Sequence, residues 1–233
     1  MKDRIFVIDG SSYLYRAFHA MPPLSTSTGI PTGAIKGVTN MLMTLKKDSE
    51  GSPIIVVFDA KGKTFRNDIF SSYKANRPPM PDDLRSQIEP VKLICKAIGF
   101  PLLIIDGVEA DDVIATVAEK AKRRNLKCVI SSLDKDLMQL VEDPKVSMMN
   151  TMTHQIFDEE KVLDKFGVKP TQIRDLLALT GDSSDNIPGI PKVGQKTAAK
   201  WLNEFENIKN IKSNADSIKG VVGDNLRGFI TDL

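Results

Sequence analysis

The chain has 233 residues, of which 41% are hydrophobic and 27% charged, an ordinary composition for a globular protein that excludes a largely disordered chain. No apolar run reaches eighteen residues, and the run 5–8 is too short for a signal segment, so we expect a cytoplasmic protein without a membrane-spanning helix. With only two cysteines and two histidines, the chain is poor in the ligands that zinc sites use, so a zinc site is not expected. The net charge is only +2, but basic stretches within 61–77 and 192–200 favour a polyanionic partner.

Short β-branched apolar runs alternate with helical patterns along the first two thirds of the chain. The runs predict strands at 4–9, 53–59, 102–106, 127–131 and, more weakly, 145–149. Apolar residues at helical spacing predict helices at 34–45, 84–98 and 113–121. Continuous apolar strands separated by amphipathic helices indicate an α/β fold with a mainly parallel sheet covered by helices on both faces.

Two regions depart from this alternation. The connection 65–81 is polar and basic and ends in Arg77-Pro78-Pro79-Met80-Pro81, which is incompatible with a helix interior and too long for an ordinary loop. After about Gly167 the strand patterns stop, and helices are predicted at 170–180 and 195–205 around a loop rich in Gly, Ser, Asp and Pro. We therefore expect a sheet domain over 1–167 and a small helical module over 168–233.

Acidic residues follow four of the predicted strands. Because the carboxyl ends of parallel strands meet at one edge of a sheet, these side chains are expected to converge, and the helical module can add two more. The acids after the strands are Asp9, Asp59, Glu109, Asp111, Asp112, Asp134 and Asp136, and those in the module are Asp182 and Asp185.

Such a cluster of carboxylates requires counter-charge. Oxygen-only ligands select hard cations, so Mg²⁺, with Mn²⁺ as a substitute, is the expected partner, and two such ions would suit the hydrolysis of a phosphodiester. Each acid also has a simpler explanation, because Asp111 and Asp112 suit a helix N-terminus and Asp134 suits an N-cap. A phosphotransferase with an aspartyl nucleophile normally has a second Asp two residues after the first, where this chain has Ser11.

Several segments, in this order along the chain, resemble the 5′-nuclease (flap endonuclease) domain of bacterial DNA polymerase I. They are Val7-Ile8-Asp9-Gly10-Ser11-Ser12, Phe58-Asp59-Ala60-Lys61, Tyr73-Lys74-Ala75-Asn76-Arg77-Pro78, Glu109-Ala110-Asp111-Asp112, Asp134-Lys135-Asp136-Leu137 and Gly181-Asp182-Ser183-Ser184-Asp185-Asn186. The resemblance implies a PIN-like α/β fold followed by a helix–three-turn–helix module, and cleavage of DNA at 5′ ends, nicks and 5′ flaps during replication and repair.

The resemblance also implies roles for particular residues. Asp9, Asp59, Glu109, Asp111 and Asp112 match a first metal site, and Asp134, Asp136, Asp182 and Asp185 match a second. Arg16, Tyr73, Lys74 and Arg77 match positions near the scissile phosphate, and the connection 65–81 matches an arch over the 5′ single strand. Loop packing for Tyr73 and an outward helix face for Arg16 are the simpler alternatives.

The segment Ile187–Ala198 has the pattern of a helix–hairpin–helix. Gly189 and Gly194 would let backbone amides approach a phosphate, and Lys192, Lys196 and Thr197 would add contacts to the DNA backbone. In the family this loop also binds a monovalent cation, usually K⁺. Lys192 stands where many relatives have a small residue.

Three questions stay open at the level of the sequence. The chain ends at Leu233 where relatives continue, so it is either a fragment of a polymerase or a standalone nuclease, expected to be a monomer. A PIN-type ribonuclease and a non-catalytic module that binds branched DNA are the alternative functions. The balance between exonuclease and flap cleavage is not encoded in any motif.

Overall fold

The computed structural model describes residues 3–231, which divide into two compact units. The first unit comprises the chain up to Phe65 together with Pro78–Phe157, and the second comprises Arg66–Arg77 together with the chain from Asp158 onward. The segment Arg66–Arg77 therefore packs with a part of the chain that follows it by about a hundred residues.

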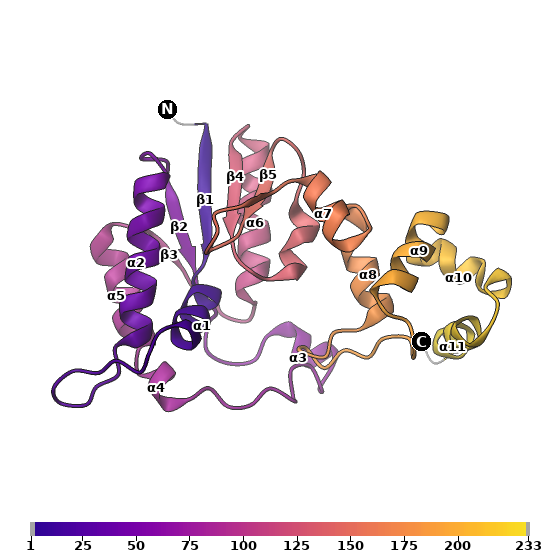
Figure 1. Ribbon diagram of the computed structural model, residues 1–233, viewed down its shortest axis with the longest axis horizontal. Helices are drawn as coiled ribbons and strands as arrows, with labels where there is room; N and C mark the ends of the chain where they lie inside the picture. Colours follow the sequence, from indigo (N-terminus) through magenta and orange to yellow (C-terminus); the bar gives the residue numbers. More distant parts are fainter. Residues whose placement is uncertain (1–2, 232–233) are drawn as a thin grey trace. The chain divides into compact units, whose positions relative to one another are not determined.

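The first unit contains a six-stranded sheet in the order β3-β2-β1-β4-β5-β6 (Figure 1). The strands are β1 (Arg4–Asp9), β2 (Ile54–Val57), β3 (Leu102–Leu103), β4 (Lys127–Ser131), β5 (Val146–Met149) and β6 (Ile156–Phe157). All neighbouring strands are parallel except β5 and β6. The α/β fold with a mainly parallel sheet is therefore confirmed.

Helices connect the strands of this unit. They are α1 (Gly10–Ala20), α2 (Gly33–Asp48), α4 (Asp82–Arg85), α5 (Ile88–Ile98), α6 (Ala110–Arg123) and the 3-10 helix η1 (Lys135–Leu140). Helix α3 (Phe65–Ile69) begins the polar connection and, apart from Phe65, belongs to the second unit. The chain leaves β1 for β2 and β3 on one side and then returns to place β4 on the other side. This reversal creates a switch point at the carboxyl ends of β1 and β4, where open α/β sheets hold their ligands.

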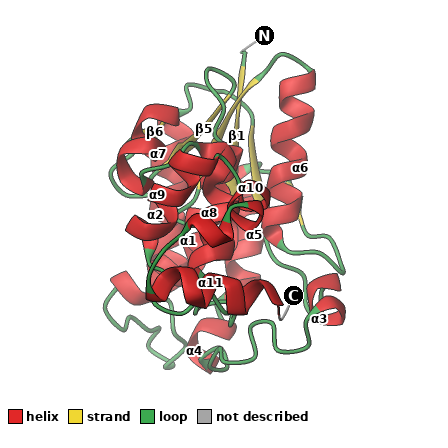
Figure 2. Ribbon diagram, turned by 90° about the vertical axis from the view of Figure 1, so that its right-hand side faces the viewer, coloured by secondary structure: helices red, strands yellow, loops and turns green. Residues whose placement is uncertain are grey.

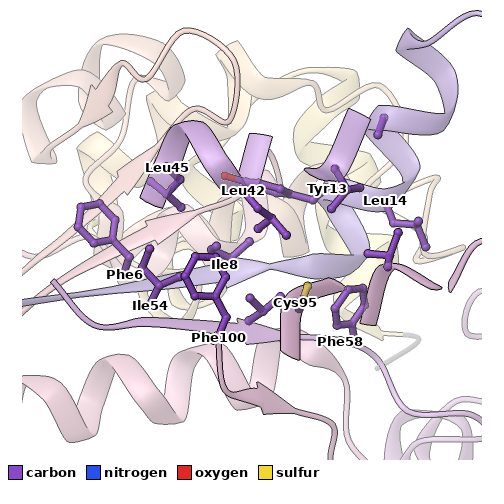
Figure 3. Packing of buried hydrophobic residues seen from close by; sticks show 14 of the residues in the cluster. Phe6, Ile8, Tyr13, Leu14, Leu42, Leu45, Ile54, Phe58, Cys95 and Phe100 are labelled. Carbon is purple, nitrogen blue, oxygen red and sulfur yellow. The ribbon is translucent and has the colours of Figure 1, made fainter. Parts of the chain in front are cut away.

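The main core lies between one face of the sheet and helices α1, α2 and α5 (Figure 3). Phe6 and Ile8 of β1 point into it, together with Tyr13 of α1 and Leu42 of α2. Val7 is also fully buried, and because side chains alternate along a strand it faces the opposite side, where α6 packs against β1 and β4 (Figure 2). A strand buried on both faces explains why β1 and β4 appear in the sequence as continuous apolar runs.

The second unit is helical from Glu159 onward. Its elements are α7 (Glu159–Phe166), η2 (Pro170–Gln172), α8 (Ile173–Thr180), α9 (Gln195–Phe205), α10 (Ile208–Ser213), η3 (Ala215–Ser217) and α11 (Val221–Thr231). Ala198, Trp201 and Leu202 of α9 are buried, as are Leu176 and Leu179 of α8 against which that helix packs. Within residues 3–231, no helix has both the length and the apolar character needed to span a bilayer.

Candidate active site and nucleic-acid interface

The carboxylate of Asp9 lies at the switch point of the sheet and is 5% exposed. One of its oxygens, Oδ1, accepts a hydrogen bond from the backbone N–H of Ser12 (2.8 Å) and so caps α1. The other, Oδ2, accepts one from the hydroxyl of Ser132 (2.7 Å), the residue after β4. Both oxygens of Asp9 are thus held by donors from the two central strand ends.

Burial makes the charged form of Asp9 unfavourable. Loss of solvation raises the pKa of this carboxyl group from 3.8 to about 6, although the hydrogen bonds from Ser12 and Ser132 oppose the shift. The negative charges of Asp59 and Asp134 also raise the pKa. The charges of two acids that follow other strands of the sheet therefore act on the carboxyl group of Asp9.

Asp59 and Asp112 both cap helix α6. The carboxylate of Asp59 accepts a hydrogen bond from the backbone N–H of Ala110 (2.8 Å), and that of Asp112 accepts one from the N–H of Glu109 (3.0 Å). Asp111 lies next to Asp112 in the first turn of the helix. Apart from Asp9, the acids predicted for the first metal site therefore lie around the N-terminus of α6.

Asp134 caps η1, because its side chain accepts a hydrogen bond from the backbone N–H of Asp136 (2.9 Å). The N–H of Asp134 itself donates to the hydroxyl of Ser132, which in turn donates to Asp9. Ser132 thus connects the first acid of the sheet with the acids after β4. The structural roles considered for Asp112 and Asp134 are both present, and they do not exclude a second role as ligands.

The arrangement of these acids does not by itself enclose a cation. In the described part of the chain, no three Asp, Glu, His or Cys side chains are grouped in a way that could hold a metal ion. Each capping bond to α6 or η1 uses one oxygen of its carboxylate, and a carboxylate can accept such a bond and coordinate a cation as well. The chemistry of the donors nevertheless suits a hard divalent cation, since carboxylates from several chain segments are coupled through their charge.

Serine residues form the part of this site to which the sequence analysis assigned no role. Ser11 accepts a hydrogen bond from the N–H of Asp59 (3.2 Å), and Ser132 bridges Asp9 and Asp134. Arg16 is half-buried in α1 of the same unit. Ser11 and Ser132 each lie two residues from an acid of the site, but a serine at that distance from an acid has no distinctive pattern of its own.

The second unit brings together the remaining predicted acids and the residues of the polar connection. The side chain of Asp185 accepts hydrogen bonds from Tyr73 (3.0 Å) and Arg77 (2.7 Å). Asp182 is buried, and its carboxylate accepts from the backbone N–H of Ser184 (2.8 Å). Residues that the resemblance placed near the scissile phosphate are therefore in contact with a residue it assigned to a metal.

The predicted hairpin loop is fixed by close backbone contacts. Gly189 lies against the end of α8 so tightly that a Cβ atom there would be 2.1 Å from the carbonyl carbon of Thr180. Ile190 and Val193 are buried, whereas Gly194 is exposed and precedes α9. Lys192 has a φ of 66°, a conformation that favours glycine, which explains why a small residue suits this position.

Replacing Gly189 by alanine is therefore expected to destabilise the second unit by about 3 kcal/mol or more, because the new methyl group meets backbone atoms that cannot move aside. Replacing Gly194 is the matched control, since nothing lies within 4 Å of a Cβ at that position and φ is −100°. Its expected cost is below about 1 kcal/mol. Urea denaturation followed by circular dichroism measures both, and equal costs would contradict the packing role of Gly189.

A basic groove runs beside α9 in the same unit. Its volume is about 640 Å³, and its lining includes Lys196, Thr197 and Lys200 of α9 together with Lys219 before α11. Glu204 contributes one negative charge to this lining. Lys219 was not expected from the sequence, because it reaches the groove from a segment that lacks a motif.

Family models match almost the whole chain. Residues 4–167 match a family described as 5′-3′ exonuclease, N-terminal resolvase-like domain, and residues 168–233 match 5′-3′ exonuclease, C-terminal SAM fold. The DNA polymerase I of Pseudomonas aeruginosa is 58% identical over 198 residues, which cover 85% of this chain but 22% of that protein. A 5′-3′ exonuclease of Aquifex aeolicus is 49% identical over 90% of this chain and 72% of its own length.

Solved structures with the same fold include nucleases with metal ions or DNA. The T5 5′-exonuclease with bound zinc has a TM-score of 0.82 at 23% identity and covers 97% of this chain and 84% of its own. A variant of the T5 D15 flap endonuclease with DNA and metal ions has a TM-score of 0.81 at 24% identity, with the same coverage. The catalytic core of Rad2 with a DNA substrate has a TM-score of 0.62 at 19% identity, covering 99% of this chain and 73% of its own. At these identities the likeness concerns the fold.

Proposed function

Because the chain belongs to the 5′-3′ exonuclease family, we propose that it hydrolyses phosphodiester bonds at 5′ ends, nicks and 5′ flaps of DNA in replication and repair. The observation that carries this proposal is the electrostatic coupling of Asp9 with Asp59 and Asp134 at the switch point of the sheet. A buried acid whose pKa is raised partly by two neighbouring carboxylates, in a fold of this family, is suited to binding divalent cations. The chain is thus proposed to be a phosphodiesterase.

Two Mg²⁺ ions, which Mn²⁺ can replace, are the proposed cofactors. The first ion would be held by Asp9, Asp59, Glu109, Asp111 and Asp112. The second ion would be held in part by Asp134, Asp136 and Asp182. When bound, such ions lower the pKa of a coordinated water and neutralise charge on the phosphate that this water attacks. The carboxylates act as ligands, since a nucleophilic role would not require so many of them.

The chain's own residues supply orientation and positive charge. Ser12 and Ser132 fix the carboxylate of Asp9 in one rotamer, so that its oxygens are in place before substrate arrives. Lys74, Arg77 and Arg16 are proposed to stabilise negative charge on the reacting phosphate, and Tyr73 to stack on a terminal base. The connection 65–81 is proposed to cover the 5′ strand as an arch.

The helical module is proposed to bind duplex DNA through its backbone. The proposed contact lies at the start of α9 and in the loop before it, and it consists of Gly189, Lys192, Gly194, Lys196 and Thr197. K⁺ is a proposed ligand of this loop. Lys200 and Lys219 extend the positive charge along the groove. We also propose that the parent chain carries a polymerase domain and that the protein is monomeric and cytoplasmic.

Digestion of labelled substrates tests this function. A 5′-flap DNA and a single-stranded RNA of the same length are incubated with the protein and Mg²⁺, with and without a chelator. We expect short products from the flap DNA, loss of cleavage with chelator and little cleavage of the RNA. Preferential cleavage of RNA would indicate a PIN-type ribonuclease, and binding of the flap without any metal-dependent product would indicate a non-catalytic module.

A further inference from the structure

The carboxylate of Asp185 is surrounded by positive charge and hydrogen-bond donors. The hydroxyl of Tyr73 donates to Oδ2 (3.0 Å), and the guanidinium of Arg77 donates to Oδ1 (2.7 Å). The ammonium group of Lys74 lies 4.0 Å from Oδ1. Only 13% of the Asp185 side chain is exposed, so solvent screens these interactions weakly. Two cations and one hydroxyl therefore satisfy a single carboxylate.

The same two segments are joined by further hydrogen bonds. The backbone N–H of Lys74 donates to the carbonyl oxygen of Asp185 (2.9 Å), and Arg77 Nε donates to that of Ser184 (3.0 Å). Asn76 donates to the carbonyl of Ser183 (2.8 Å), and Asn186 donates back to that of Ser72 (2.8 Å). The contacts are numerous and almost entirely polar.

The segment 66–77 depends on these contacts for its conformation. Tyr73 is its single buried residue, so the hydrophobic effect contributes little to its order. Lys74 has a φ of 56°, which an L-residue adopts at some cost and keeps only when its surroundings impose it. The loop that carries Asp185 supplies those surroundings.

We infer that Asp185 is a positioning residue, which fixes Tyr73, Lys74 and Arg77 for contact with DNA, and that it is not a metal ligand. A divalent cation at this carboxylate would be repelled by the two positive charges that already lie within 4.0 Å of Oδ1, and would compete with them for its negative charge. The inference rests on the proposed nuclease function, and it departs from the role that the family resemblance implies for Asp185. The remaining acids keep their proposed roles.

The first test counts bound metal without reference to catalysis. Electron paramagnetic resonance of free Mn²⁺ measures the number and affinity of bound ions in the wild type, in Asp185→Asn and in Asp134→Asn. We expect Asp185→Asn to bind the same number of ions with wild-type affinity, while Asp134→Asn binds fewer or binds about tenfold more weakly. Loss of an ion, or a comparable weakening, in Asp185→Asn would overturn the inference.

The second test asks whether Asp185 acts through Arg77. In a double-mutant cycle on 5′-flap DNA with Mg²⁺, Asp185→Asn and Arg77→Gln are each expected to lower kcat/KM about tenfold or more. The double variant is expected to resemble the worse single variant, because both changes break one interaction. Multiplied effects would contradict the inference, and Lys192→Ala combined with Arg77→Gln is the control pair for which multiplication is expected.

A third measurement uses the unaltered protein, in case Asp185→Asn does not fold. Trypsin cleavage after Lys74 reports whether the segment 66–77 is released. Mg²⁺ without DNA is expected to leave this cleavage rate unchanged, whereas faster cleavage on adding Mg²⁺ would show that the ion takes Asp185 from Arg77 and would overturn the inference. Flap cleavage by the wild type tests the nuclease function separately, so the two failures are distinguishable.

Discussion

Replacing Asp134 or Asp112 by asparagine is expected to lower the cleavage of 5′-flap DNA by about a hundredfold or more, with DNA binding largely retained. The amide oxygen of asparagine can still accept the hydrogen bond from the N–H of Asp136 or Glu109 that each carboxylate accepts now. The caps of η1 and α6 therefore persist, and the change removes the negative charge needed to bind Mg²⁺. Single-turnover kinetics measure the rate, and fluorescence anisotropy with chelator present measures binding.

Asp106→Asn is the matched control for these two variants. Asp106 follows the same strand as Glu109 and is exposed, but it belongs to none of the proposed metal sites. Its replacement changes the net charge by the same amount and is expected to leave cleavage nearly unchanged. Wild-type rates in both Asp112→Asn and Asp134→Asn would remove these acids from the active site, and an equal loss in Asp106→Asn would indicate a general effect of charge.

The sequence predicted the central strands well because their burial leaves a clear pattern. The bounds of β1 and β4 were predicted correctly, since each strand has an inner run of mostly buried apolar residues that begins after a basic residue and ends before a polar one. The strand expected at 102–106 was too long, because β3 contains only Leu102–Leu103. Its neighbour β2 ends at Val57, which pairs with Leu103, so Ile104 and Ile105 lack a partner strand and are exposed.

Several elements of the structure escaped prediction, among them some of the shortest. Strand β6 has two residues, too few for an alternating pattern, and it is antiparallel to β5. The helices α7, α10 and α11 were also not predicted. In α10, six residues with one buried side chain give no helical periodicity. Tertiary contacts, which a local pattern does not record, decide such elements.

The candidate site was predicted in part. The strand-final acids followed from the rule that parallel strands end at one edge, and the coupling of Asp9 with Asp59 and Asp134 agrees with that rule. The contact of Asp185 with Tyr73 joins residues 112 positions apart, and neither local spacing nor residue type encodes it. The sequence could therefore indicate which acids belong to the family motifs but not which partners each acid has.

Replacing Asp9 is expected to raise the stability of the protein, because this buried carboxylate is costly to keep charged, and to abolish its activity. Its pKa is about 6 in the folded protein, against an ordinary value of 3.8 that we take for the unfolded chain, so the folded state holds the proton more tightly. The stabilising contribution of this proton is fully present below pH 3.8 and is lost as the pH rises through 6. At pH 7.5 without divalent ions, burial of the charged carboxylate is expected to cost about 3 kcal/mol, since each unit of pKa is worth about 1.36 kcal/mol.

The Asp9→Asn variant is therefore expected to be more stable than the wild type at about pH 7.5 without metal, by about 1–3 kcal/mol, although it cleaves no DNA. Asparagine keeps an acceptor for the N–H of Ser12 and carries no charge to desolvate. The advantage should be much smaller at about pH 4.5, where Asp9 is protonated in the folded state, and should vanish below pH 3.8. Urea denaturation at both pH values, with and without Mg²⁺, measures the difference between variant and wild type.

Added Mg²⁺ should stabilise the wild type more than the variant, because the ion neutralises the buried charge that only the wild type carries. A difference that is independent of both pH and Mg²⁺ would mean that Asp9 neither carries a buried charge nor binds the ion.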